Sequence, residues 1–382
     1  MSQWITANAF AQRELAPAIS PDVRNRTVRA TVRAGLSGTG IQLVLEEGYG
    51  KTAAAYNAIV LEAGGKTYDV LFQGRPSVTV WPGEQVVSDA LSLAVRAGDE
   101  LTLLFAMGDG ASMSETTLEQ RHSAPGDYTH GGFAPVEYHN PLPGVPFNER
   151  LCGLKELRVE AADDAAAIAA FGDSVTESAV WVAPLGEKLA ALRPDTAILN
   201  LGIGGNRLLR DTNVPAIAGL NAFGRAGLRR LDSDVLALSG VKAVIVAMGV
   251  NDIAQPGGPP GFSPPASELC TFEELRDGML ETIKRCRAAG LAVIGATVTP
   301  FKGYPSYGEK SAGVRNALND WIRTSGVFDY VLDLAALLCD PGDSEALSPG
   351  YGLGDGLHPN PIGGKAAVDG IDAAALLQAI GL

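Results

Sequence analysis

The chain has 382 residues, more than a single hydrophobic core usually supports, so two domains are expected. Hydrophobic residues make up 46 % of it and charged residues only 19 %, which is typical of a globular protein. The net charge of −13 argues against a nucleic-acid partner, because binding to a phosphate backbone requires clustered Lys and Arg.

Targeting and redox signals are sparse. No window approaches the run of about 18 uncharged apolar residues that predicts a membrane span, and the first 20 residues lack the basic and apolar regions of a signal peptide. We expect a cytoplasmic protein, or a secreted one if a signal was removed. The four cysteines are scattered and predict neither a zinc site nor a disulfide framework: Cys152, Cys270, Cys286 and Cys339. The redox state of these cysteines and the oligomeric state of the protein stay open.

The first part of the chain reads as β-structure. Between residues 24 and 107, short aliphatic and β-branched runs are separated by Gly-Gly, Pro-Gly and Gly-Asp turns, which predicts an antiparallel β-sandwich. Residues 108–150 are rich in Gly, Pro, Tyr and His and predict a long connecting loop. Three histidines in this stretch, His122, His130 and His139, are interpreted as loop residues in preference to metal ligands. Residues 1–150 are therefore assigned to an N-terminal domain.

The pattern changes after residue 151. Helical segments, such as residues 271–290, alternate with near-continuous apolar runs at 166–172, 196–202, 243–249, 291–298 and 329–334. Such alternation predicts a parallel sheet covered by helices on both faces. Residues 151–382 are therefore expected to form a doubly wound α/β domain with a five-stranded parallel sheet.

The residues that follow these strands are candidates for chemistry, because open α/β sheets bind ligands outside the carboxyl ends of their strands. Ser174 follows the first run, Gly205 the second and Asn251 the third, while Asp355 and His358 lie in a late loop. Each has an ordinary alternative as a helix cap or a tight turn. Together they supply a nucleophile, a base, an orienting carboxylate and oxyanion donors, the set that acyl transfer requires.

The order of these motifs resembles that of the SGNH hydrolases, also called GDSL esterases. The matching segments are "FGDSVTES", "LNLGIGGNRLL", "GVNDI" and "DGLHPN", spread over nearly all of the second domain. The resemblance extends to a bacterial subgroup with a β-rich N-terminal domain, through residues 74–89, 202–211, 297–304 and 317–334. It implies an SGNH or flavodoxin-like fold. The first motif has Val175 where the family's older name has Leu.

The resemblance also implies roles for individual residues. Ser174 is the implied nucleophile, His358 the general base and Asp355 its orienting carboxylate. The implied oxyanion donors are the N–H groups of Ser174 and Gly205 and the side-chain amide of Asn251. No metal or cofactor is implied.

The ester is less sharply indicated. The expected substrate is a small-molecule or carbohydrate ester with a short acyl chain, such as an O-acetyl group, and candidate substrate contacts are Asn206, Arg207 and Tyr304. A broad lipase or arylesterase is one alternative. Another is a non-hydrolytic protein that cradles a phosphate at residues 202–206, although no P-loop Lys is present. The N-terminal domain is expected either to bind carbohydrate, with Trp81 stacking on a sugar, or to be structural.

Overall fold

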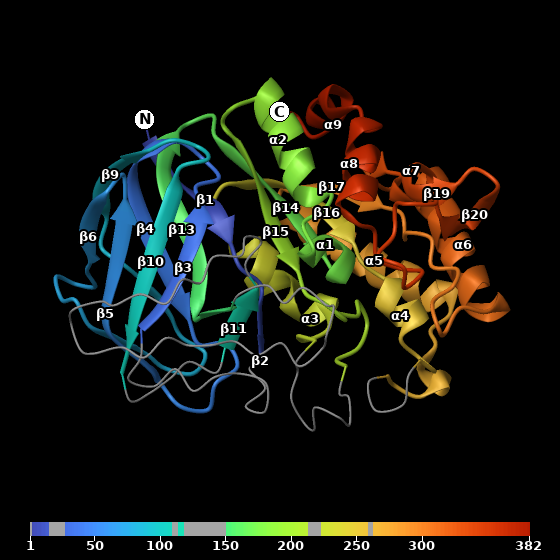
Figure 1. The fold of residues 1–382 in the computed structure, drawn as a ribbon, viewed down its shortest axis with the longest axis horizontal. Helices are drawn as coiled ribbons and strands as arrows, with labels where there is room; N and C mark the ends of the chain where they lie inside the picture. The colour runs from blue at the N-terminus through green and yellow to red at the C-terminus, as the bar shows by residue number, and fades with distance from the viewer. Residues whose placement is uncertain (1, 15–26, 109–113, 118–149, 213–222, 259–262) are drawn as a thin grey trace. The chain divides into compact units, whose positions relative to one another are not determined.

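The computed structural model describes residues 2–14, 27–108, 114–117, 150–212, 223–258 and 263–382, and Figure 1 traces them. They form two compact units, Met1–Ala165 and Ala166–Leu382. The expected boundary after residue 150 is therefore too early. Strand β13, Leu154–Ala162, pairs on one side with β1, Ser2–Ala9, and on the other with β4, Gly38–Glu46, so its backbone hydrogen bonds place it in the first unit.

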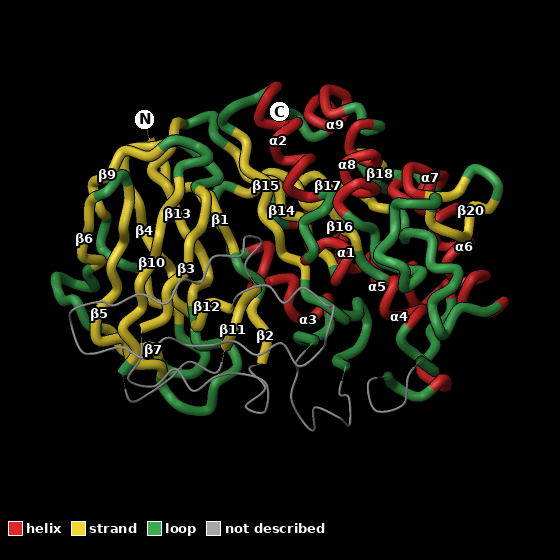
Figure 2. Tube along the Cα trace, viewed as in Figure 1, coloured by secondary structure: helices red, strands yellow, loops and turns green. Residues whose placement is uncertain are grey.

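The described part of the first unit consists of β-sheets (Figure 2). Their strand pairs are antiparallel, as the sandwich prediction requires. One sheet has the order β1-β13-β4-β8, with β9 also paired to β4; β8 is Gln85–Val87 and β9 is Leu91–Val95. The second has the order β3-β10-β5-β6, with β7 also paired to β5. Its strands are Thr27–Arg33, Glu100–Met107, Ala54–Ala63, Lys66–Val70 and Val78–Val80.

A third, three-stranded sheet joins β12, β11 and β2, which are Arg150–Cys152, Ser114–Thr117 and Gln12–Glu14. Strand β11 thus falls inside the stretch expected to be a loop, whereas His122, His130 and His139 lie outside the described residues. Trp81 lies on the turn after β7 and is 60 % exposed. It is therefore not part of the core of the first unit.

The second unit is built on a parallel five-stranded sheet of order β15-β14-β16-β17-β18, which confirms the doubly wound prediction. This is the flavodoxin-like order 2-1-3-4-5. Strands β14, Ala166–Gly172, and β15, Thr196–Gly202, have the predicted bounds. The other three strands are shifted or shortened relative to the apolar runs and are Val241–Ala247, Ala292–Ala296 and Tyr330–Leu332.

Helices cover both faces of this sheet (Figure 1). On one face, apolar side chains of β14, β16 and β17 form a core cluster with α2, α7, α8 and α9, which are Val182–Leu192, Leu334–Leu338, Pro361–Asp369 and Ala373–Ala379. The other face carries α3, α5 and α6, which are Gly227–Leu231, Phe272–Ala288 and Glu309–Thr324. The remaining described elements of this unit are the short helices α1, Ser174–Glu177, and α4, Val250–Ala254, a π-helical turn at Asp232–Leu236, a 3-10 turn at Ala266–Glu268 and a hairpin of β19, Cys339–Asp340, and β20, Asp343–Leu347.

Helix α5 shows how local sequence determines an element. Thr271 caps its first turn, accepting the Glu274 N–H at 3.2 Å, and the Glu274 carboxylate accepts the Thr271 N–H at 2.8 Å. This reciprocal capping box satisfies two N–H groups that an α-helix otherwise leaves unpaired. Apolar residues at helical spacing, Leu275, Met279 and Ile283, are buried.

Candidate active site

Three strands of the parallel sheet end at the same level. Gly172, the last residue of β14, pairs with Gly202 of β15 and with Ala247 of β16. Strand β14 lies between the two parallel strands, so the chain adds β15 on one side of β14 and then crosses to add β16 on the other side. This is the topological switch point at which doubly wound sheets bind ligands. The loops after these strands carry Ser174, Gly205 and Asn251.

Ser174 is the first residue of α1, Ser174–Glu177. Asp173 caps this helix, with a carboxylate oxygen accepting the Val175 N–H at 3.0 Å. The short helix lies tightly against the sheet edge, because a Cβ atom at Gly202 would lie 2.2 Å from the Glu177 nitrogen. A turn this close to the strands holds the serine at the edge of the sheet and leaves its side chain partly exposed.

A line of hydrogen bonds joins the serine to the late loop. His358 Nε2 lies 2.8 Å from Ser174 Oγ, and His358 Nδ1 lies 2.5 Å from Asp355 Oδ2. The other Asp355 oxygen accepts the N–H groups of His358 and Leu357 at 2.9 and 3.0 Å. The structure thus brings together all three residues implied as a triad. A base between a hydroxyl and an orienting carboxylate is the arrangement that activates a serine.

The electrostatics of Asp355 favour its charged form. Burial raises the pKa of its carboxyl, but the hydrogen bond from His358, the His358 charge and the backbone donors together outweigh burial, and the net effect lowers the pKa to about 2. Asp355 is therefore a carboxylate throughout the neutral range. A fixed negative charge beside Nδ1 orients the imidazole and stabilises its protonated form.

The turn after β15 lies beside the serine. A Cβ atom at Gly204 would lie 3.9 Å from Ser174 Cβ, and Gly205 has a φ of +73°, the left-handed region that favours glycine. Gln255 Nε2 donates to the Gly205 carbonyl at 2.8 Å, which fixes the orientation of this turn. Among the described residues, neither the Ser174 N–H nor the Gly205 N–H has a backbone acceptor, so both are available as donors.

Asn251 supplies a side-chain donor from the third loop. It is the second residue of α4, Val250–Ala254, and it is buried. Its Nδ2 donates to the Asn206 carbonyl at 3.1 Å, which ties it to the residue after Gly205. An amide nitrogen carries two hydrogens, so one remains for a further acceptor.

Two of the expected substrate contacts have other partners. Asn206 is fully buried, with Nδ2 donating to the carbonyls of Phe223 and Arg225 at 2.6 and 2.8 Å. Arg207 is 3 % exposed, and its guanidinium binds Thr212 Oγ1, the Glu268 carboxylate and the Asp211 carbonyl. These hydrogen bonds show that both side chains hold the loop in place. Their polarity indicated exposed residues that could contact a substrate, but the loop folds back over them and buries them.

Tyr304 remains a candidate for the rim of the site. It is partly exposed, and both burial and the Asp355 charge raise the pKa of its hydroxyl. Its backbone lies against the loop that carries Asp355 and His358, because a Cβ atom at Gly356 would lie 2.7 Å from the Tyr304 nitrogen. The tyrosine is therefore close to Asp355.

Two buried carboxyl groups support the loops. Asp252 accepts the N–H groups of Leu208 and Leu209 at 2.7 and 3.0 Å, and burial is the main reason that its pKa is raised to about 6. Burial also raises the pKa of Asp173 to about 7, although the Val175 N–H and the His358 charge oppose this shift. Asp252 thus holds the loop after β15 from the interior, whereas Asp173 is the buried cap of α1.

A cavity of about 20 Å³ lies beneath the serine turn, large enough for one water molecule. Within the described ranges, Trp181 Nε1 and Thr299 Oγ1 on its wall are buried and have no hydrogen-bond partner. Asp173 also lines the cavity.

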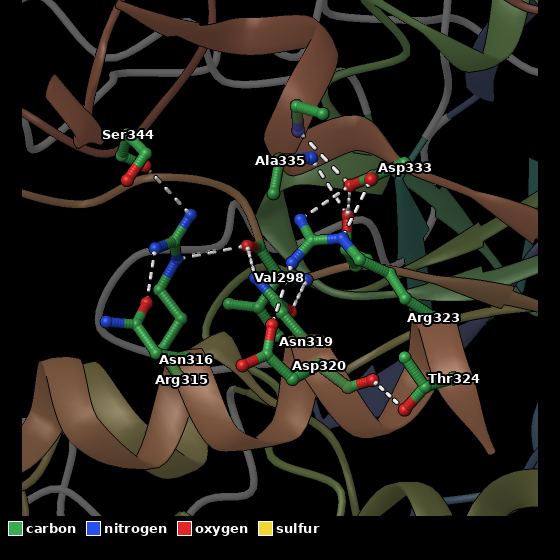
Figure 3. A network of polar contacts seen from close by, with 12 residues as sticks. Val298, Arg315, Asn316, Asn319, Asp320, Arg323, Thr324, Asp333, Ala335 and Ser344 are labelled. Atoms are coloured by element: carbon green, nitrogen blue, oxygen red, sulfur yellow. Dashed lines mark hydrogen bonds and ion pairs between the residues drawn. The ribbon is translucent and has the colours of Figure 1, made fainter. Parts of the chain in front are cut away.

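The loop after β17 is held from below by α6, as Figure 3 shows. Arg315 Nε donates to the carbonyls of Val298 and Thr299 at 3.1 and 3.0 Å. Asn319 accepts the Val298 N–H at 2.8 Å and donates to the Val298 carbonyl at 2.9 Å. This loop leads to Tyr304, so α6 holds in place the backbone that precedes this candidate substrate contact.

A second part of the same network anchors the start of α7. Asp333 accepts a hydrogen bond from Thr297 Oγ1 at 2.9 Å and forms an ion pair with Arg323 (Figure 3). Thr297 Oγ1 in turn accepts the Ala335 N–H at 2.9 Å. Polar residues scattered along a predicted helix do not indicate such contacts, because their partners lie on other elements.

Metal and membrane signals are absent from the described parts of the chain. Among these residues, no three His, Cys, Asp or Glu side chains are arranged to hold a metal ion. No described helix combines the length and apolar character needed to cross a membrane.

Comparison with known proteins identifies a family. The model of the GDSL-like lipase/acylhydrolase family matches residues 170–366. Similar solved structures include a GDSL-like lipase from Bacteroides thetaiotaomicron, 20 % identical with a TM-score of 0.39, covering 56 % of this chain and 87 % of that one. An acetylxylan esterase from Geobacillus stearothermophilus is 18 % identical with a TM-score of 0.39, covering 57 % and 94 %. No curated protein matches the chain.

Proposed function

Because the chain belongs to the GDSL-like lipase/acylhydrolase family, we propose that it is a serine esterase that hydrolyses short-chain carboxylic esters through an acyl-enzyme. Ser174 is the nucleophile, His358 the general base and Asp355 the orienting carboxylate. The observation that carries the proposal is the line of hydrogen bonds from Ser174 Oγ through the imidazole to Asp355.

The reaction proceeds in two similar halves. His358 Nε2 takes the Ser174 proton as Oγ attacks the ester carbonyl carbon, and the carbonyl oxygen becomes an oxyanion. The N–H groups of Ser174 and Gly205 and the Asn251 amide donate to that oxyanion. The C–O bond to the alcohol then breaks as His358 returns the proton to the leaving oxygen. Water repeats the sequence on the acyl-enzyme and releases the acid.

A short acyl group on a small molecule or carbohydrate is the substrate class that we favour. The described part of the second unit exposes large apolar side chains only on separate elements: Leu192, Leu280, Leu353 and Ile362. A lipase that binds a lipid surface needs a contiguous apolar patch. Tyr304, beside the loop that carries Asp355 and His358, is the residue that we expect to contact the alcohol part of the substrate.

The first test compares hydrolysis of p-nitrophenyl acetate, butyrate and octanoate by the wild type and Ser174→Ala. Ser178→Ala is the matched control, since Ser178 is an exposed serine directly after α1. We expect turnover to fall with chain length, to disappear in Ser174→Ala and to persist in Ser178→Ala. Equal rates in wild type and Ser174→Ala would refute the nucleophile, and a preference for octanoate would favour a lipase.

A carbohydrate substrate has its own test. Acetate release from acetylated xylo-oligosaccharides and from acetylated small alcohols is measured under the same conditions. A sugar-directed site is supported if kcat/KM is higher on the acetylated sugars and if Tyr304→Ala lowers kcat/KM on the sugars but not on p-nitrophenyl acetate. Equal kcat/KM values on all the acetates would instead indicate a general acetylesterase.

The first unit offers a second candidate activity, carbohydrate binding. Its specific support is Trp81, which is 60 % exposed on the turn after β7, since exposed aromatic rings are available to stack on apolar sugar faces. Retention of the full chain on insoluble xylan is compared with that of Trp81→Ala. Loss of retention in the variant supports binding at Trp81, and absence of retention in the wild type leaves a structural role.

A further inference from the structure

One buried cation lies directly behind the loops of the active site. Arg230, in α3, is 2 % exposed, and its guanidinium lies over the Phe171 ring at 4.2 Å. It forms an ion pair of 3.0 Å with Asp234, which is also buried. A buried charge is tolerated when it is paired and hydrogen-bonded. Arg230 has the Asp234 carboxylate as its ion-pair partner, and Nε, Nη1 and Nη2 each donate a hydrogen bond.

The other bonds of this guanidinium converge on the active-site loops. Nη2 donates to the Gly172 carbonyl at 2.8 Å, Nη1 to the Leu201 carbonyl at 3.0 Å, and Nε to Asn206 Oδ1 at 2.9 Å. Gly172 ends β14 two residues before Ser174. Leu201 lies at the end of β15, and Asn206 closes the turn that contains Gly205.

These acceptors connect to all three expected oxyanion donors. Gly172 leads into the Ser174 N–H, Asn206 follows Gly205, and the Asn206 carbonyl accepts the Asn251 amide. The Gly172 carbonyl also accepts the Ile203 N–H at 3.2 Å, so the guanidinium reinforces an existing link between the two strand ends. One rigid group therefore binds directly to the ends of β14 and β15 and to the turn after β15, and it is linked to the loop of Asn251 through Asn206.

We propose that Arg230 is a positioning residue that holds the Ser174, Gly205 and Asn251 donors in a single oxyanion-binding geometry. The inference rests on the proposed esterase function for its effect on rate. Arginine suits the task because its planar fork directs several N–H groups at fixed angles, whereas lysine concentrates its donors on one nitrogen.

Two variants test the proposal, Arg230→Lys and Arg230→Met, with two controls. Arg229→Met removes the neighbouring, 62 % exposed arginine. Leu376→Ala removes a buried side chain of α9 from the core cluster, so it lowers stability without changing a residue that Arg230 contacts. For each protein we measure kcat and KM on p-nitrophenyl acetate, the thermal midpoint, and amide hydrogen exchange in peptides that cover residues 172–175 and 202–206.

We expect kcat of Arg230→Lys to fall about 10²-fold, the loss typical of one oxyanion donor, with KM changed less than about threefold. Exchange in the two loop peptides should rise about tenfold in both Arg230 variants and not in Arg229→Met. Leu376→Ala should lower the thermal midpoint without lowering kcat per folded molecule, which separates positioning from stability.

Wild-type kcat in Arg230→Lys, or a loss of kcat in Leu376→Ala that matches its loss of stability, would overturn the positioning role. If Arg230→Met does not fold, Arg230→Lys decides. If the wild type hydrolyses no ester, the proposed function fails, and the exchange measurement still tests the positioning. Unchanged loop exchange in Arg230→Lys would then refute it.

Discussion

His358 Nε2 lies 2.8 Å from Ser174 Oγ, although the two residues are 184 positions apart in the chain. Ser174 follows the first strand of the sheet, and His358 precedes α8 near the end of the chain. The carboxyl ends of parallel strands meet at one edge, and this geometry makes such distant residues neighbours. Because the two loops are distant in the chain, each can be altered by its own substitution.

Asn251→Ala tests the side-chain oxyanion donor. The substitution removes the amide that donates to Asn206 and leaves one donor fewer for the oxyanion. We expect kcat on p-nitrophenyl acetate to fall about 10²- to 10³-fold, with a small change in KM. Full activity in this variant would remove Asn251 from the site.

Gly205→Ala tests the oxyanion turn, and Gly290→Ala is its matched control. The φ angles are +73° and +78°, so both substitutions cost about 1 kcal/mol or more through the left-handed conformation. A Cβ atom at Gly205 would also lie 2.5 Å from the Phe223 ring, whereas nothing lies within 4 Å at Gly290. We expect both variants to lose stability in urea unfolding and only Gly205→Ala to lose kcat. Similar kcat values in the two variants would contradict the assigned role of the turn.

Asp355→Asn tests the orienting carboxylate. The pKa of about 2 means that the wild-type side chain is charged at every pH at which the enzyme is assayed, so the amide removes one negative charge. We expect kcat to fall about 10³- to 10⁴-fold at neutral pH. A loss below about tenfold would show that His358 is oriented by other groups.

The same lowered pKa has a consequence for stability. A carboxyl group whose folded-state pKa lies below the unfolded value stabilises the native state above the unfolded pKa and loses that contribution as the pH falls. For Asp355 the window runs from about pH 4 to pH 2. Thermal midpoints measured across this range should fall less steeply in Asp355→Asn than in the wild type.

Asp173→Asn tests the opposite shift. The pKa of Asp173 is raised from 3.8 to about 7, so between these values the native state binds more protons than the unfolded state, and its stability falls as the pH rises. Asparagine retains the cap on the Val175 N–H and does not titrate. The thermal midpoint of the variant relative to wild type should therefore increase from pH 4 to pH 7.

The control for this experiment is Asp372→Asn, the same change at the exposed cap of α9, where the side chain accepts the Ala375 N–H at 3.0 Å. A difference between variant and wild type that stays constant with pH at position 173 would show that the carboxyl is not destabilised by burial there.

Much of the second unit could be predicted because its signals are local. The apolar runs of β14 and β15 end at glycines, and Ser174, Gly205, Asn251 and His358 each follow a recognisable turn. A parallel sheet then brings these turns to one edge without further information. The grouping of Ser174, Asp355 and His358 therefore followed from strand order and from the resemblance to a known family.

Other features depend on contacts that a linear pattern does not contain. Arg207 and Arg230 are basic residues that look exposed in the sequence, and both are buried because backbone carbonyls and carboxylates surround them. Strand β13 was missed because its alternating Leu, Lys, Glu and Arg residues lie at the boundary between two patterns. It pairs with β1 and β4, and such partners are known only once the sheet is assembled.

The shared level of Gly172, Gly202 and Ala247 also limits how the chain can change in length. Deletion of one residue inside β14 would draw Ser174 back by about 3.3 Å and exchange the two faces of the strand. The serine would then lose His358, and the buried alanines would meet the wrong layer of helices. We expect insertions and deletions to be tolerated at open turns such as Gly290, and to abolish folding and activity together within the three strands that meet at this edge.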